Sequence, residues 1–269
     1  ASRAGWTDWD SISLSEREDR VEAEFWRLVH SVEELVDVEY GADVHSTTHG
    51  HASPTMEGHP RNAYARSGWN LNNLPILHGS LLRYIRSEIS GMTAPWIYIG
   101  MMFSAFCWHN EDHYTYSINY QHFGATKTWY GVPGAHAEAF ESAMERIAPE
   151  LFAACPDLLL QLVTMMSPEL AKREGVRMYA CNQHPNEFVV TYPKAYHSGL
   201  NHGFNLNEAV NFALPDWVMQ GLECVRRYQK HARQPVFSHD ELLVSIALHS
   251  QQLSTAAWLH PAFDDMVSR

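Results

Sequence analysis

Residues 106–131, FCWHNEDHYTYSINYQHFGATKTWYG, contain most of the residue types that a metal-dependent oxidation requires. At the centre of this stretch is His109-Asn110-Glu111, in which an imidazole and a carboxylate stand two positions apart. Side chains at positions i and i+2 of a β-strand project to the same face, so this pair can hold one ion without a bend in the backbone. The stretch therefore predicts a metal site on a strand.

A third metal ligand has to come from elsewhere in the chain, and His197 is the best candidate. It follows an apolar, strand-like run at residues 188–192, so a later strand can return beside the first. Two neutral imidazoles and one carboxylate form the set that non-haem Fe(II) prefers, with open positions for a co-substrate and dioxygen. Zinc accepts the same three ligands, so the triad alone leaves the metal open.

Residues downstream of the pair favour an acidic co-substrate beside the metal. If the strand continues, Ser117 and Asn119 share the parity of the two ligands, and Lys127 follows a turn that contains a glycine. A cation and short hydrogen-bonding side chains next to a metal suit a small dicarboxylate.

Two neighbours of Glu111 are close enough to compete as metal ligands. Asp112 has the wrong parity for a ligand, and His113 is expected to lie behind the ligands.

Several segments of the chain resemble the jumonji-C oxygenases and, among these, the JARID-type histone H3 lysine 4 demethylases. The segments around the predicted site are residues 108–113, 116–120, 127–133 and 196–199. Residues 25–29, 38–43, 67–73 and 236–239 resemble the same family, so the matches span nearly the whole chain in the family's order.

This resemblance implies a mixed α+β fold, a jumonji-C double-stranded β-helix of the jelly-roll or cupin type, with flanking helices. It implies oxidation of an N-methyl group on a lysine of the histone H3 tail, with lysine 4 as the expected position. The oxidation is expected to use Fe(II), 2-oxoglutarate and O2. Formaldehyde, succinate and CO2 are the expected products. It further implies a nuclear chromatin regulator whose full-length form carries other chromatin-targeting domains.

The resemblance also assigns roles to individual residues. His109, Glu111 and His197 correspond to the catalytic iron ligands. The residues expected to bind or surround 2-oxoglutarate are Tyr40, Phe106, Ser117, Asn119, Lys127, Trp129 and Asn201, with Lys127 on the far carboxylate. Tyr98 and Asn211 are expected to bind the substrate. The aromatic face of Tyr98 would attract a methylated ammonium group, and Asn211 corresponds to a pocket-lining asparagine of the family.

Two other classes of protein remain open. One is a chromatin-binding module that has this fold and no catalysis, against which the intact triad and Lys127 argue. The other is a zinc-containing, cupin-like binding or hydrolytic protein. Asn110 and the segment at residues 184–186 differ from the residues associated with animal relatives, so the source and the fine substrate preference stay open. The lysine site and its methylation state depend on overall similarity alone.

Composition favours a globular, intracellular protein. Of the 269 residues, 45% are hydrophobic and 19% are charged, and no apolar run or basic-then-apolar amino terminus predicts a membrane span or signal peptide. The four cysteines lack C-x-x-C spacing, which predicts reduced thiols. A net charge of −12 disfavours direct nucleic-acid binding by this segment and is compatible with a basic peptide partner.

Patterns along the chain predict a catalytic domain at residues 1–214, with a helical insertion at about residues 133–175, and a helical segment at residues 215–269. Strands are expected at residues 36–40, 96–101, 177–181, 187–192, 196–199 and 208–214. Helices are expected at residues 15–35, 79–87, 133–148, 167–175, 218–231 and 242–248.

Ser15 and Glu18 have capping-box spacing, and the charged face of the first helix is expected to be solvated. Histidines at positions 45, 49, 51 and 59 are irregularly spaced in loop-like sequence, which favours a surface loop over a metal site.

Overall fold

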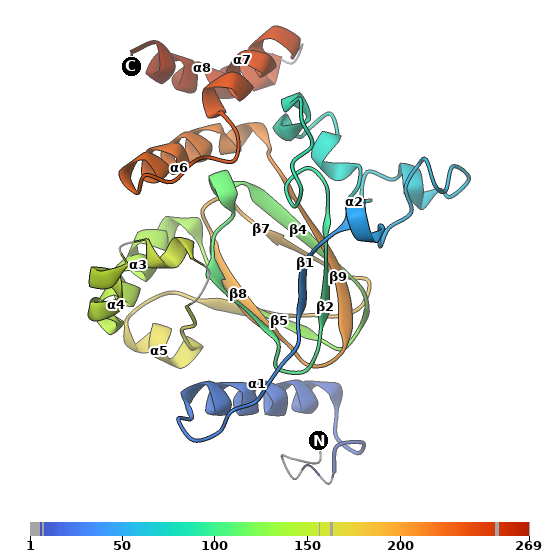
Figure 1. Cartoon of the computed structure of the whole chain (residues 1–269), viewed down its shortest axis with the longest axis vertical. Coiled ribbons are helices and arrows are strands. Elements are labelled where there is room, and N and C mark those ends of the chain that lie inside the picture. The colour runs from blue at the N-terminus through green and yellow to red at the C-terminus, as the bar shows by residue number, and fades with distance from the viewer. Residues whose placement is uncertain (1–5, 7, 156, 162–163, 251–252, 269) are drawn as a thin grey trace.

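Two antiparallel β-sheets lie at the centre of the molecule, with helices on the outside (Figure 1). The structure is a computed structural model that describes residues 6, 8–155, 157–161, 164–250 and 253–268. The five-stranded sheet has the order β1 (Gly41–His45), β2 (Trp96–Gly100), β9 (Asn205–Phe212), β4 (Tyr116–Gly124) and β7 (Phe188–Thr191). The four-stranded sheet has the order β3 (Ala105–His109), β8 (Tyr196–Asn201), β5 (Lys127–Val132) and β6 (Tyr179–Gln183).

The chain winds between these two sheets in the way that a double-stranded β-helix requires. Strands β2, β3, β4 and β5 alternate from one sheet to the other. On the return path, β6 and β7 add to the edges of the two sheets, β8 lies between β3 and β5, and β9 lies between β2 and β4. Each new strand therefore pairs with strands from distant parts of the sequence. The predicted mixed α+β jelly roll is confirmed.

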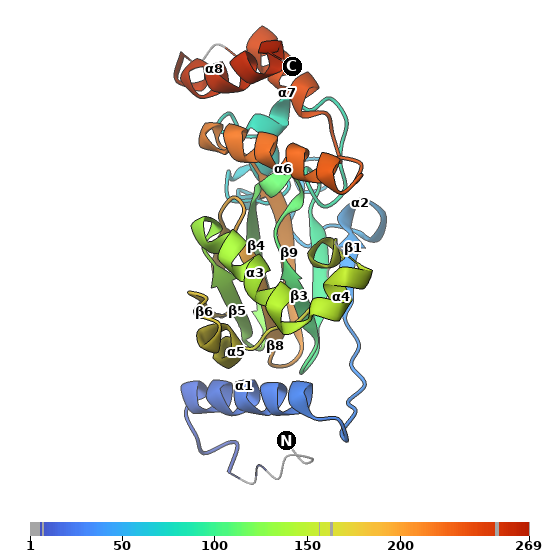
Figure 2. The ribbon, with the colours of Figure 1, turned by 90° about the vertical axis from the view of Figure 1, so that its left-hand side faces the viewer.

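Helices surround the sheets on several sides (Figures 1 and 2). They are α1 (Leu14–His30), α2 (Ser46–His49), α3 (Ala137–Ile147), α4 (Pro149–Ala154), α5 (Pro168–Arg173), α6 (Val218–Lys230), α7 (His239–His249) and α8 (Leu253–Ser268). Among the described residues, no helix is both long and apolar enough to cross a bilayer. All four cysteines are free thiols, as expected.

The first helix differs from its prediction at both ends and on its polar face. Ser13, rather than Ser15, caps α1, because its Oγ accepts a hydrogen bond from the backbone N–H of Glu16 at 3.2 Å. The helix ends at His30, since Ser31 takes an extended conformation. The charged face is not wholly solvated, because the carboxylate of Glu18 is buried against the four-stranded sheet.

The predicted insertion forms α3, α4 and α5, which lie over the outer side of the four-stranded sheet (Figure 2). Phe140 of α3 is buried against Trp108 and Tyr196, with ring centroids 4.9 and 4.7 Å away. The backbone N–H of Trp108 donates to the carbonyl of Thr164 at 3.0 Å, at the free edge of β3. The insertion thus covers a face of the sheet as well as the expected edge.

Two other local predictions were wrong. Residues 36–40 are not a strand, because pairing with β2 begins only at Gly41. Residues 79–87 do not form an α-helix but a single 3₁₀ turn, Leu81–Tyr84. The backbone N–H of Leu81 donates to the carbonyl of Ala213 at 2.7 Å, so this segment is held to the end of β9 instead of to its own next turn.

The stretch around His109 is not one continuous strand. Strand β3 ends at His109, a 3₁₀ turn occupies Asp112–Tyr114, and β4 begins at Tyr116 in the opposite sheet. His113 and Tyr114 both have φ of 54°, the left-handed region that residues with a side chain seldom adopt. The parity argument for Ser117 and Asn119 was therefore wrong, because these residues lie on the opposite sheet and face the three predicted metal ligands across one cavity.

Candidate metal centre and its cavity

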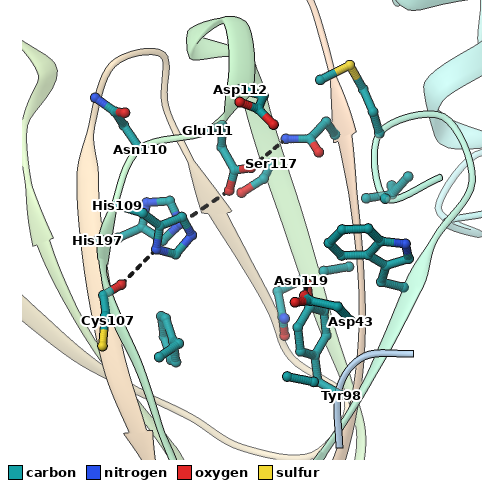
Figure 3. Close-up of a pocket in the computed structure, with 18 of the residues that line it drawn as sticks. Asp43, Tyr98, Cys107, His109, Asn110, Glu111, Asp112, Ser117, Asn119 and His197 are labelled. Carbon is teal, nitrogen blue, oxygen red and sulfur yellow. Dashed lines mark hydrogen bonds and ion pairs between the residues drawn. The ribbon is translucent and has the colours of Figure 1, made fainter. Parts of the chain in front are cut away.

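The three predicted metal ligands meet at one end of the barrel (Figure 3). His109 and His197 are cross-strand neighbours on β3 and β8, and Glu111 follows directly after β3. One potential ligand atom of each residue lies within 4.8 Å of the other two. Nε2 of His197 is 3.2 Å from Oε1 of Glu111.

The backbone fixes which nitrogen of each imidazole is available to a metal. Nδ1 of His109 lies 2.8 Å from the carbonyl oxygen of Cys107, and Nδ1 of His197 lies 3.1 Å from that of Ala195. A carbonyl oxygen can only accept, so Nδ1 carries the hydrogen in both rings. Each Nε2 is left to bind an ion, which is the usual arrangement behind metal-bound histidines.

The electrostatics of the cluster favour the protonation states that a metal needs. Burial would raise the pKa of Glu111, but its contacts with His197 and His109 and the hydrogen bond from Asn211 lower the pKa to about 2. Burial and the neighbouring His197 lower the pKa of His109 to about 4. At neutral pH the cluster therefore offers an ionised carboxylate together with a neutral His109.

This donor set fits a divalent transition metal. Two imidazole nitrogens and one carboxylate oxygen suit Fe(II), and they also suit zinc. No other group of three or more metal-binding side chains meets the same distance limit among the described residues. The histidines at positions 45, 49, 51 and 59 do not converge in this way.

A cavity of about 470 Å³ opens beside the three predicted metal ligands. Most residues that sequence reasoning placed around the co-substrate and substrate line it, namely Tyr40, Tyr98, Phe106, Ser117, Asn119, Lys127, Trp129 and Asn211. Asn201 does not line the cavity, because its side chain is buried against Ser104 and Asn205. The volume is within the range of small-molecule sites.

Lys127 places a buried positive charge in this cavity. Its side chain is only 2% exposed, and Nζ donates to the hydroxyl of Tyr40 at 3.0 Å. Four aromatic rings surround the ammonium, with centroids 4.6 Å (Phe106), 5.5 Å (Tyr40), 5.6 Å (Trp129) and 5.8 Å (Tyr98) from Nζ. Within the described part of the chain, no carboxylate forms an ion pair with it. A buried charge of this kind favours an anionic ligand.

Asn211 and Asp43 add two polar contacts that sequence reasoning did not specify. Nδ2 of Asn211 donates to Oε2 of Glu111 at 2.8 Å, which leaves Oε1 on the side of the histidines. The hydroxyl of Tyr98 donates to Oδ1 of Asp43 at 3.0 Å, and Asp43 also lines the cavity. The left-handed backbone of Asp43, with φ of 54°, has no signal in the local sequence.

His113 does not lie behind the ligands as expected. Its ring stacks on Phe237 with centroids 3.8 Å apart, and its Nε2 accepts the backbone N–H of Val236 at 3.1 Å. The turn after Glu111 is therefore joined to the C-terminal helical segment. Trp217 adds to this connection by donating from Nε1 to the carbonyl of His113 at 2.8 Å.

Comparison with known proteins gives two adjacent family matches. Residues 96–212 match the model described as "JmjC domain, hydroxylase", and residues 216–268 match "Lysine-specific demethylase 5, C-terminal helical domain". Lysine-specific demethylase 5B of Gallus gallus is 52% identical over 232 residues, which are 84% of this chain. Lysine-specific demethylase 5D of Homo sapiens is 51% identical over 238 residues, which are 87% of it. The chain spans only 15% and 16% of the lengths of these two relatives.

Proposed function

Because the chain belongs to the lysine-specific demethylase 5 family, with a JmjC domain and a C-terminal helical domain, we propose that it is an iron- and 2-oxoglutarate-dependent histone lysine demethylase. The observation that carries this proposal is the convergence of His109, Glu111 and His197 on a cavity that also holds the buried ammonium of Lys127. A metal-binding face and an anion-binding group in one cavity are what an iron enzyme with an acidic co-substrate needs.

In this proposal each set of side chains in the cavity has a separate role. His109, Glu111 and His197 hold Fe(II) through three positions and leave the others free. When bound, Fe(II) and 2-oxoglutarate supply the chemistry that activates O2. Lys127 and Tyr40 hold the far carboxylate of 2-oxoglutarate, and Ser117 and Asn119 donate further hydrogen bonds. Phe106 and Trp129 exclude water from that end of the cavity.

The substrate proposed is a methylated lysine of the histone H3 tail, with lysine 4 first among the candidates. The ring of Tyr98 and the carboxylate of Asp43, which are joined by a hydrogen bond, offer a negative, aromatic wall to a methylated ammonium. Overall, one oxygen atom of O2 enters succinate and the other enters the N-methyl carbon. The resulting hydroxymethyl amine breaks down to formaldehyde and the amine, and CO2 leaves from 2-oxoglutarate.

The setting proposed for this reaction is chromatin in the nucleus. The chain's net charge of −12 is complementary to a basic peptide such as a histone tail. Its relatives are several times longer, so the whole protein is expected to carry other domains that direct it to chromatin.

Formaldehyde release from an H3 peptide trimethylated at lysine 4 tests this function. The protein supplied with Fe(II), 2-oxoglutarate and O2 is expected to release formaldehyde and succinate in equal amounts. His109→Ala is expected to abolish the release, whereas the exposed His49→Ala should leave it unchanged. A His109→Ala protein with undiminished turnover would contradict the proposal. Peptide binding without turnover would support a catalytically silent module, and tightly bound zinc without 2-oxoglutarate dependence would support a zinc protein.

A further inference from the structure

The interior of the barrel next to the cavity is filled with side-chain amides, and their hydrogen bonds determine how Asn119 faces the cavity. The four amides are those of Asn119, Gln121, Gln183 and Asn207, and each is at most 5% exposed. Asn119 and Gln121 come from β4, Gln183 ends β6, and Asn207 lies on β9. Of these four, sequence reasoning identified only Asn119.

The orientation of Gln183 follows from groups whose hydrogen-bonding roles are unambiguous. Nε1 of Trp129 lies 2.9 Å from Gln183, and an indole N–H can only donate, so the atom facing it is Oε1. At the other end, Nε2 of Gln183 lies 3.1 Å from the backbone carbonyls of both Asn119 and Glu187. Carbonyl oxygens can only accept, so both ends give the same orientation.

The amide of Asn119 is oriented by this glutamine and by Asn207. Nε2 of Gln183 donates to Oδ1 of Asn119 at 3.2 Å, and Nδ2 of Asn207 donates to the same oxygen at 2.7 Å. Nδ2 of Asn207 also faces the side-chain oxygens of Gln121 and Gln183, at 3.4 and 3.3 Å, so it cannot be exchanged for the amide oxygen. Two donors therefore occupy Oδ1 of Asn119.

The amide nitrogen of Asn119 remains for the cavity. Asn119 and Lys127 both line the cavity. Figure 3 shows Asn119 across from His109 and His197. No hydrogen-bond partner of its Nδ2 is found among the described residues. From this we infer that Gln183 and Asn207 are positioning residues, which turn the NH₂ group of Asn119 toward an anionic co-substrate beside Lys127.

This inference depends on the proposed function, because it takes a carboxylate of 2-oxoglutarate as the group that Asn119 meets. The opposite orientation of Asn119 would place its NH₂ against the NH₂ groups of Gln183 and Asn207. That orientation would also turn Oδ1 of Asn119 toward the co-substrate carboxylate, and the two oxygens would repel each other. Asn207 and Gln183 thus decide whether Asn119 aids or opposes co-substrate binding, although neither lines the cavity.

The substitution Asn207→Asp tests the inference. A carboxylate at position 207 accepts instead of donating, so Asn119 should rotate its NH₂ toward it and its oxygen toward the cavity. Binding of 2-oxoglutarate to the Mn(II)-loaded protein, measured by calorimetry, is expected to weaken roughly ten- to hundredfold, the range for loss of a hydrogen bond to a charged group. In turnover, KM for 2-oxoglutarate should rise in the same proportion, while kcat at saturation and KM for the peptide should stay unchanged.

Two variants separate orientation from packing and from the burial of a charge. Asn207→Leu removes the donor without supplying an acceptor, so Gln183 still orients Asn119 and affinity should fall less than about threefold. Asn205→Asp makes the same change two residues along β9, where the amide is 1% exposed and donates to Ala125 and Asn201 instead. This control should lose a similar amount of thermal stability and keep its affinity for 2-oxoglutarate.

Other outcomes would overturn the inference in recognisable ways. A folded Asn207→Asp protein that binds 2-oxoglutarate as tightly as the wild type would refute the positioning role alone. Equal losses in Asn207→Asp and Asn207→Leu would assign the effect to packing and also refute it. A wild-type protein that binds Mn(II) but no 2-oxoglutarate would overturn the proposed function and, with it, this inference.

Discussion

Glu111 and Glu18 are both poorly accessible carboxylates beside histidines, yet their surroundings leave them very different possibilities. Oε1 of Glu18 accepts from Thr126 Oγ1 and His184 Nε2, both at 2.7 Å, and Oε2 accepts from Asn182 at 2.9 Å. Among the described residues, Glu111 has a side-chain amide donor at Oε2 alone, from Asn211, and its Oε1 faces Nε2 of His197 beside a cavity.

The difference shows that residue types alone do not define a metal site. The Glu18 group joins α1 to the four-stranded sheet, and its hydrogen bonds complete it without a ligand. In the Glu111 group the backbone carbonyls hold the imidazole hydrogens at Nδ1, so lone pairs converge on one point. Converging lone pairs repel one another, and a cation relieves that repulsion.

Removing each carboxylate should give the largest contrast between the two groups. Glu111→Ala leaves two neutral donors for the metal, so affinity for Mn(II) is expected to fall by more than about a hundredfold, which exceeds the usual cost of losing a residue behind a ligand. Calorimetric titration with Mn(II) measures it.

The matched change Glu18→Ala should retain Mn(II) affinity within about a factor of two, while leaving buried donors unpaired and lowering the free energy of unfolding by about 1–3 kcal/mol. If Glu18→Ala lost the metal, or Glu111→Ala kept it, the contrast between the two carboxylates would fail.

Acid should lower the free energy of unfolding through two buried histidines, one near the Glu111 group and one near the Glu18 group. Burial lowers the pKa of His113, two residues after Glu111, to about 3. Burial also lowers the pKa of His202 to about 4, and its ring contacts Thr128, which donates to Asn182. The unfolded chain takes up these protons near pH 6.5 and the folded chain does not. The contribution of these two neutral histidines to the free energy of unfolding is therefore fully present above pH 6.5. Below pH 6.5 the free energy of unfolding falls by about 1.4 kcal/mol per pH unit for each histidine.

Urea denaturation at several pH values between 7.5 and 4.5 measures this loss. His202→Gln should reduce the slope by about one histidine's share. A free energy of unfolding that stays constant from pH 6.5 to 4.5 would show that these two rings are not held neutral by the fold.

Removing the hydroxyl of Tyr228 is expected to change the free energy of unfolding by less than acid does. Among the described residues, this hydroxyl contacts the turn after Glu111 and has no contact with the Glu18 group. It accepts the backbone N–H of His113 at 3.0 Å and donates to Oδ1 of Asp112 at 2.9 Å, within the left-handed turn after Glu111. Tyr228→Phe leaves that N–H without its partner, so the free energy of unfolding should fall by about 1–3 kcal/mol.

The affinity of the Tyr228→Phe protein for Mn(II) should also fall a few-fold, because the turn positions Glu111. Tyr179→Phe provides a control, since Tyr179 is exposed, and it should change stability by less than about 0.5 kcal/mol. Equal stability of the two variants would mean that the Tyr228 hydroxyl does not hold the turn.

The sequence predicted the features that depend on local spacing and on strong residue types. The His109–Glu111 pair, the return of His197 and the cation at Lys127 belong to this class. Residues whose position depends on distant partners were missed. The break between β3 and β4 depends on Tyr228 and Trp217, more than a hundred residues later. Gln183 and Asn207 carry no local signal, because their roles depend on the winding of β6 and β9 beside β4.

The hydrogen bond from Trp217 to the turn at His113, together with the stacking of Phe237 on the same ring, bears on how this chain is divided. The border between the two family matches falls near residue 214, yet these contacts cross it into the loop that carries Glu111. A protein ending at that border would expose the turn's carbonyl and imidazole to water and lose the support for its left-handed backbone. We expect the barrel and the helices after it to unfold together as one cooperative unit.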